Sequence, residues 1–156
     1  MKDILRSTIK LVVEDIAISY FPPEFVVTPS VIVEIGDDEK YKSTAADYTA
    51  IVAFNGDING GMNLAAPAHV TLKLAGALAQ EEFVQFDDMV ADSFGELANM
   101  IAGEVKQKLS QLNDSLIELT PPVVATGNNH RYNSSMNSTK QYFTIGSSPF
   151  FVEVFY

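Results

Sequence analysis

The longest regular pattern in the sequence is a run of apolar residues at helical spacing between Val90 and Leu112. At about 100° per residue, these residues fall within one arc of about 120°, which is the core-facing stripe of an amphipathic helix. Phe86-Asp87-Asp88 precedes the run, and aspartates are favoured there because the helix dipole is positive at its start. We therefore predict a long helix from about residue 86 to residue 112.

The rest of the chain predicts two further helices and several short strands. The helices are expected at about residues 2–20 and 67–80, and the strands at Phe25–Ile35, Tyr48–Phe54, Gly61–Ala65, Val123–Thr126, Tyr142–Ile145 and Phe150–Phe155. Three helices packed with a largely antiparallel sheet make an α+β fold. With 156 residues, the chain is expected to form a single domain spanning 1–156. Each half runs from a helix through a Pro-Pro pair to a strand and a hairpin, so two repeated halves and a chance likeness both stay open.

The charge balance argues against nucleic acid and membrane surfaces as partners. The formal net charge is −10, from 20 acidic and 10 basic residues, and such a field repels phosphate backbones and anionic lipid. The chain has no cysteine, so disulfides and thiolate metal sites are excluded. The first ten residues lack the apolar core of a signal peptide, and no 18-residue apolar run occurs. We expect a cytoplasmic protein.

The polar side of the long helix is the most informative surface that the sequence predicts. Asp92, Glu96, Asn99 and Gly103 share an arc of about 60°, almost opposite the apolar stripe. The small residues Gly95, Ala102 and Gly103 were placed on this side too, and helix-interior glycine costs about 0.5–1 kcal/mol relative to alanine. Close approach of another surface, from this fold or from a partner, would offset that cost. A solvated helix can also show such a pattern, so the geometry does not name the target.

Other groups of residues predict no separate site. His69 and His130 lie far apart in the sequence without partners at ligand spacing, so neither a metal site nor a catalytic triad is indicated. The glycines from Gly56 to Gly61 precede a strand and are typical of a turn. The segment 128–138 reads as a solvated polar loop. The aromatic end of the chain, residues 150–156, is either a core strand or an exposed edge used in dimerisation.

The run Asp92-x-x-x-Glu96-x-x-Asn99-x-x-x-Gly103 resembles the signature helix of the CheC, CheX and FliY family. Segments 54–64 and 122–127 resemble CheX-type segments in the same order. Proteins of this family remove phosphate from the phospho-aspartate of the chemotaxis response regulator CheY. CheC-type members carry the motif twice. In the first helix of this chain the best-aligned carboxylate, Glu14, is followed three residues later by Ala17, which favours the CheX pattern of one site per chain.

The resemblance implies a role for each residue of the motif. Glu96 would hold the active-site lysine of the regulator, and Asn99 would orient the attacking water, since an amide can donate and accept hydrogen bonds at once. Asp92, Gly95 and Gly103 would contact the partner. No cofactor is expected on this chain, because Mg²⁺ would be supplied by the regulator. The resemblance also implies a homodimer.

A second hypothesis assigns the same fold to a different class of function. The chain would be a non-catalytic adaptor that docks a regulator in a chemotaxis or other two-component pathway without hydrolysing its phosphate. The presence of both Glu96 and Asn99 argues against this hypothesis. Tight binding of the phosphorylated regulator with an unchanged phosphate half-life would favour it.

Overall fold

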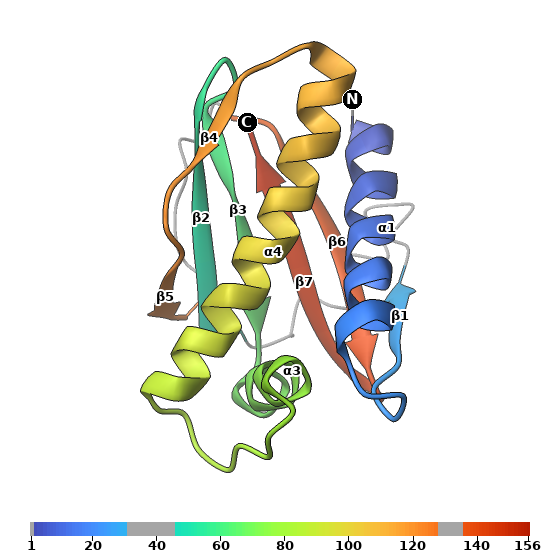
Figure 1. Cartoon of the computed structure of the whole chain (residues 1–156), viewed down its shortest axis with the longest axis vertical. Coiled ribbons are helices and arrows are strands. Elements are labelled where there is room, and N and C mark those ends of the chain that lie inside the picture. The colour runs from blue at the N-terminus through green and yellow to red at the C-terminus, as the bar shows by residue number, and fades with distance from the viewer. Residues whose placement is uncertain (1, 31–45, 128–135) are drawn as a thin grey trace.

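The computed structural model describes residues 2–30, 46–127 and 136–156 (Figure 1). It contains three helices and seven strands over these ranges. The helices are α1 (Lys2–Tyr20), α3 (Ala68–Ala79) and α4 (Asp88–Asn113). The strands are β1 (Val27–Ser30), β2 (Tyr48–Gly56), β3 (Gly60–Ala66), β4 (Ile117–Leu119), β5 (Val123–Thr126), β6 (Ser138–Ile145) and β7 (Ser148–Phe155). The predicted α+β fold is confirmed.

The helices cover one face of a single sheet. In Figure 1, α4 and α1 cross in front of the strands, and α3 lies below them. The strand order is β1-β6-β7-β3-β2-β4, with β5 also paired to β2, and every pairing is antiparallel. Since β7 lies between β6 and β3, the interpretation of the aromatic C-terminal strand as an exposed edge is wrong.

The strand order has an internal symmetry. The series α1-β1-β2-β3 and α4-β5-β6-β7 occupy equivalent places in the fold. If each strand is exchanged for its counterpart, the path β1-β6-β7-β3-β2-β5 becomes the same path read from its other end. Each half therefore contributes one strand to the hairpin of the other half, because β1 pairs with β6 and β5 pairs with β2. The two hairpins meet at the centre through β3 and β7. This arrangement favours the internal duplication that the sequence left open.

The apolar stripe of α4 forms the centre of the core. Its residues from Val90 to Leu109 are at most 3% exposed, as the helical spacing predicts. Leu112 was assigned to the same stripe, but it is 57% exposed. It lies one residue before the end of α4 at Asn113.

Several strand boundaries differ from those predicted. The turn between β2 and β3 is shorter than expected because both strands continue toward each other as far as Gly56 and Gly60. Gly56 has a φ of 127°, and a Cβ there would collide with the carbonyl oxygen of Leu116. The short strand β4 was not predicted. Of the strand expected at residues 25–35, only β1 is observed, and residues 31–35 lie outside the described residues. Most of the expected polar loop, residues 128–135, also lies outside them.

The segment after α4 folds back over one flank of that helix. Gly95 is buried beneath it: a Cβ at Gly95 would lie 3.5 Å from Cγ2 of Val124 and 3.6 Å from Cβ and Cγ of Pro122. Ala102 is fully buried as well. The placement of Gly95 and Ala102 on the solvent face is therefore wrong: both are buried between the apolar stripe and the polar arc, and the segment with Pro122 and Val124 covers Gly95.

Side-chain caps fix the starts of α3 and α4. The carboxylate of Asp87 accepts a hydrogen bond of 3.0 Å from the backbone N–H of Val90. Pro67 has no side-chain cap to offer α3, and the carboxylate of Asp47 instead accepts from the N–H of Ala68 at 2.6 Å. The expected start of the long helix at Asp87-Asp88 is confirmed to within one residue.

We expect Asp87→Ala to lower the free energy of unfolding by about 1 kcal/mol, because the N–H of Val90 loses its acceptor. Asp87→Asn keeps an oxygen in the same place, so its free energy of unfolding should fall by only a few tenths of a kcal/mol. Urea unfolding followed by circular dichroism measures both. Equal stabilities for the two variants would contradict the capping role.

The packing around Gly95 predicts effects of opposite sign for two substitutions. Gly95→Ala should raise the free energy of unfolding by about 0.5–1 kcal/mol, since its Cβ makes ordinary contacts and alanine favours the helix. Gly95→Leu should lower it by about 1–3 kcal/mol, because the larger side chain must displace Pro122 or Val124. Thermal unfolding of both variants tests this, and a stabilising leucine would contradict the packing.

Candidate functional site

The candidate site is the solvent-facing arc of α4. Asp92 and Glu96 are exposed there, and Asn99 and Gly103 are partly exposed one to two turns further along. Glu96 and Asn99 are three residues apart and therefore lie beside each other on the helix surface. The structure thus brings together four of the five residues singled out in the sequence, and the fifth, Gly95, is buried beside them.

The helix positions the side chains of the candidate site, which have no contacts of their own to hold them. The apolar stripe of α4 packs against α1, α3 and the sheet, which fixes the rotation of the helix about its axis. The side chains of Glu96 and Asn99 make no hydrogen bond or ion pair with other described residues. They are available to a partner on a rigid support, which is the arrangement that precise positioning requires.

Two residues that the sequence analysis did not single out support this face. Pro122 and Val124 cover the flank of α4 at Gly95. Gly95 immediately precedes Glu96 in the chain. The signal in the sequence was the Pro121-Pro122 pair, which lies between the long helix and the strand predicted at Val123–Thr126. It did not indicate that this segment returns to the helix. Because β5 pairs with β2, this cover is held by the sheet.

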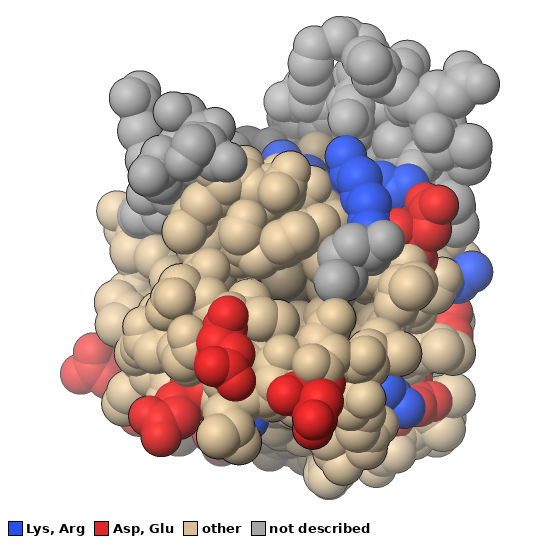
Figure 2. Space-filling view, turned by 90° about the horizontal axis from the view of Figure 1, so that it is seen from above, with Lys and Arg blue, Asp and Glu red and all other residues tan. Residues whose placement is uncertain are grey.

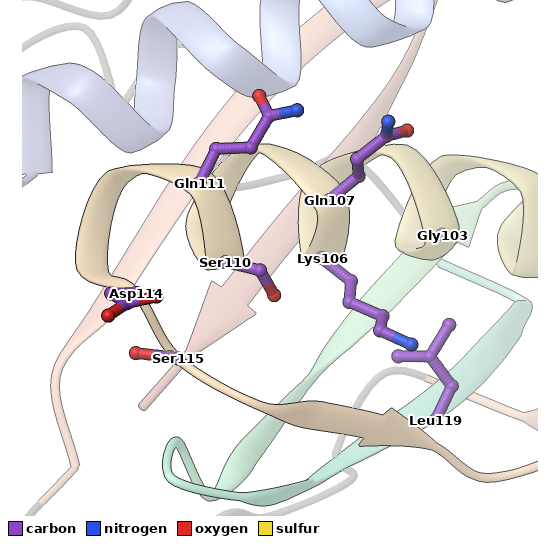
Figure 3. A pocket seen from close by; sticks show the side chains of 8 residues that line it. All are labelled: Gly103, Lys106, Gln107, Ser110, Gln111, Asp114, Ser115 and Leu119. Carbon is purple, nitrogen blue, oxygen red and sulfur yellow. The ribbon is translucent and has the colours of Figure 1, made fainter.

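Gly103 lies at one end of a groove between α4 and the segment that contains β4 (Figure 3). A Cβ at Gly103 would have no atom within 4 Å. The groove has a volume of about 550 Å³ and is open to solvent. It is lined by Gly103, Lys106, Gln107, Ser110, Gln111, Asp114, Ser115 and Leu119.

On the face seen from above, the acidic residues do not gather into one patch: some are surrounded by uncharged residues, and others lie beside Lys or Arg (Figure 2). No group of three or more His, Asp or Glu residues in ranges 2–30, 46–127 and 136–156 could hold a metal ion. Within these ranges no helix has the length and apolar character of a membrane span.

The histidine at position 69 takes part in one contact. Its Nε2 lies 3.1 Å from Oγ of Ser148, on the surface near the start of α3. Among the described residues no carboxylate bonds to this histidine, so the pair lacks the acid of a catalytic triad. His130 lies outside the described residues.

The first helix does not repeat the site. Ala17, three residues after Glu14, is 8% exposed and faces the core. The described part of the chain therefore carries the Glu-x-x-Asn arrangement on α4 and not on α1, as the sequence predicts.

Known proteins share the fold, and a family model matches much of the sequence. The family model described as "Chemotaxis phosphatase CheX" matches residues 48–145, well over half of the chain. The chemotaxis protein CheX from Vibrio vulnificus has a similar structure, with a TM-score of 0.77, 16% identity and coverage of 97% of this chain and 96% of that chain. CheX from Borrelia burgdorferi, solved as a CheX-CheY-BeF3-Mg²⁺ complex, gives a TM-score of 0.70 at 21% identity, over 97% and 94%.

A curated relative extends the comparison to a named activity. The CheY-P phosphatase CheX of Thermotoga maritima is 31% identical over 78 residues. This match spans about half of each protein, 49% of this chain and 50% of the relative. Together with the family match across α3, α4 and most of the sheet, it establishes that the chain belongs to the CheX family of chemotaxis phosphatases.

Proposed function

We propose that this protein accelerates hydrolysis of the phospho-aspartate of a CheY-type response regulator through the solvent face of α4. The observation that carries the proposal is that Glu96 and Asn99 are adjacent and accessible on a helix whose opposite face is buried. Membership of the CheX family supports it, as does the Thermotoga maritima relative that is named a CheY-P phosphatase. The Borrelia burgdorferi complex shows that a CheX of this fold binds a CheY.

The chemistry of the two side chains suits this reaction. Hydrolysis of an acyl phosphate needs a water molecule held in line with the bond that breaks, and the catalyst gains most by positioning that water. The carboxamide of Asn99 can accept a hydrogen bond from the water and donate one to a phosphoryl oxygen. In our proposal Glu96 forms an ion pair with a lysine of the regulator and so fixes the depth and direction of the approach.

The proposed mechanism divides the catalytic groups between two proteins. The regulator would contribute the phosphorylated aspartate and the Mg²⁺ that neutralises the developing charge, and this chain would contribute the amide that orients water. No covalent intermediate on α4 is needed. The adaptor hypothesis shares the docking step and lacks the hydrolysis, so a rate measurement separates the two. The homodimer stays a prediction, which light scattering of the full chain would test.

The double variant Glu96→Ala/Asn99→Ala should lose the acceleration of phosphate decay by about 100-fold or more, because the attacking water is no longer positioned. The assay phosphorylates a panel of CheY-type regulators with acetyl phosphate and follows the loss of radiolabelled phosphate. Asn99→Asp keeps the size of the side chain but removes the amide donor, so it should lose nearly as much. Glu104→Ala removes an exposed carboxylate elsewhere on α4 and serves as the matched control.

The outcome that sinks the phosphatase assignment is an undiminished acceleration by the double variant. If the intact protein binds a phosphorylated regulator tightly and leaves its half-life unchanged, the adaptor hypothesis is correct. Circular dichroism of each variant confirms that the helix is intact, which we expect because Glu96 and Asn99 make no internal hydrogen bond or ion pair.

A further inference from the structure

We infer that the groove beginning at Gly103 continues the docking surface of α4 and seats an acidic, protruding segment of the phosphorylated regulator, with Lys106 as the cation that pairs with it. This inference rests on the proposed function and adds to it a second contact region. Three features of the described residues support it: an unexplained glycine, the shape of the groove, and the distribution of charge along α4.

Neither the backbone conformation nor the packing around residue 103 requires a glycine. Its φ is not positive, so its backbone conformation is open to any residue. No neighbouring atom would contact a Cβ placed there, in contrast to Gly95, whose missing side chain makes room for Pro122 and Val124. A glycine inside a helix costs about 0.5–1 kcal/mol relative to alanine. Contacts with a partner that approaches the helix closely would offset this cost. Such an approach requires that no side chain fill the space above Gly103.

The groove lies in line with the candidate site. Gly103 follows Asn99 by one helical turn, and Lys106 follows it by two turns, about 10 Å along the axis. In Figure 3 the side chain of Lys106 extends across the groove toward Leu119, and Ser110, Asp114 and Ser115 line the part of the groove away from Gly103. A regulator whose phosphorylated site meets Asn99 therefore has its adjoining surface over this groove.

The charges on α4 change sign at Lys106. Between residues 74 and 105 the chain has no basic residue, and Lys106 is the next cation. The acidic residues of that stretch are Glu81, Glu82, Asp87, Asp88, Asp92, Glu96 and Glu104. Lys106 forms no ion pair with another described residue. Asp114 lines the groove as well, at the part away from Gly103, so Lys106 is the one cation among the lining residues. A partner surface that carries a phosphoryl group and carboxylates is anionic, so an ion pair with Lys106 would draw it to the part of the groove next to Gly103.

The test separates binding from catalysis in the full-length protein. We prepare Gly103→Leu, which fills the groove, and Lys106→Glu, which reverses its charge. The probe is the CheY-type regulator with the highest binding affinity in the panel, loaded with beryllium trifluoride and Mg²⁺ so that no hydrolysis occurs. Both variants should weaken binding of this probe by about tenfold or more. In the decay assay they should raise KM and leave kcat within about twofold, because neither residue touches the water.

Two matched controls use the same helix. Lys108→Ala removes an exposed lysine from another side of α4 and should leave KM unchanged. Gly95→Ala replaces the other glycine, which is buried, and should also bind normally. The weakening caused by Lys106→Glu should shrink as salt is raised, whereas that caused by Gly103→Leu should persist, since only the former is electrostatic. Thermal unfolding should show Gly103→Leu to be at least as stable as the parent protein.

Two results would overturn the inference. One is normal binding of the beryllofluoride-loaded regulator by both groove variants; if Glu96→Ala/Asn99→Ala still abolishes hydrolysis, the proposed function stands and the groove has no part in it. The other is a change in oligomeric state on light scattering without a change in KM, which would assign the groove to a contact between copies. The opposite result is also informative. If the groove variants weaken binding and Glu96→Ala/Asn99→Ala does not change the decay rate, the groove is a docking surface and the phosphatase assignment is wrong.

Discussion

The burial of one apolar stripe of α4 determines where everything else in the candidate site lies. From Val90 to Leu109 this stripe is removed from water against α1, α3 and the sheet, and burial of this kind is the main favourable term in folding. Rotating α4 to expose Glu96 differently would bring apolar side chains into solvent. The direction of Glu96 and Asn99 is thus set by buried residues elsewhere on the helix, so the candidate site is oriented without hydrogen bonds of its own.

The two glycines of α4 show how one residue type serves different purposes on the same helix. Gly95 allows the segment after α4 to return close to the helix axis, and that segment is anchored to β2 through β5. Gly103 faces open space beside the groove. Nothing local distinguishes the two positions, because the atoms that cover Gly95 come from Pro122 and Val124, far along the chain. The width of the polar face was overestimated for this reason: helical periodicity describes a helix by itself and does not include what later folds over it.

The same distinction between local and non-local information separates what the sequence could predict from what it could not. The three helices, the acidic start of α4 and most strands depend on neighbouring residues, and they were predicted to within a few positions. The sheet order depends on pairings between distant strands, so the sequence left open whether β7 is a core strand or an exposed edge, and the structure confirms the core strand. Strand β4 has only three residues, too few to show alternation. The exposure of Leu112 could not be read from its spacing either, since it depends on where the neighbouring elements end.

The symmetry of the sheet allows the helix of the candidate site, α4, to be compared with its counterpart, α1. If the two halves descend from one unit, the fold provides two equivalent helices, each packed on the sheet and followed by a strand that joins the hairpin of the other half. Only α4 offers a carboxylate and an amide to solvent. The outward positions of α1 include the carboxylates of Asp3 and Asp15, and three large apolar side chains, Ile4 at 48%, Leu11 at 54% and Ile18 at 80% exposure. No asparagine or glutamine occurs in α1, so this helix has no side-chain amide that could orient water. Both halves of the fold therefore hold a helix firmly on the sheet, but of these two helices only α4, whose flank is covered by Pro122, carries a carboxylate beside an amide on its surface.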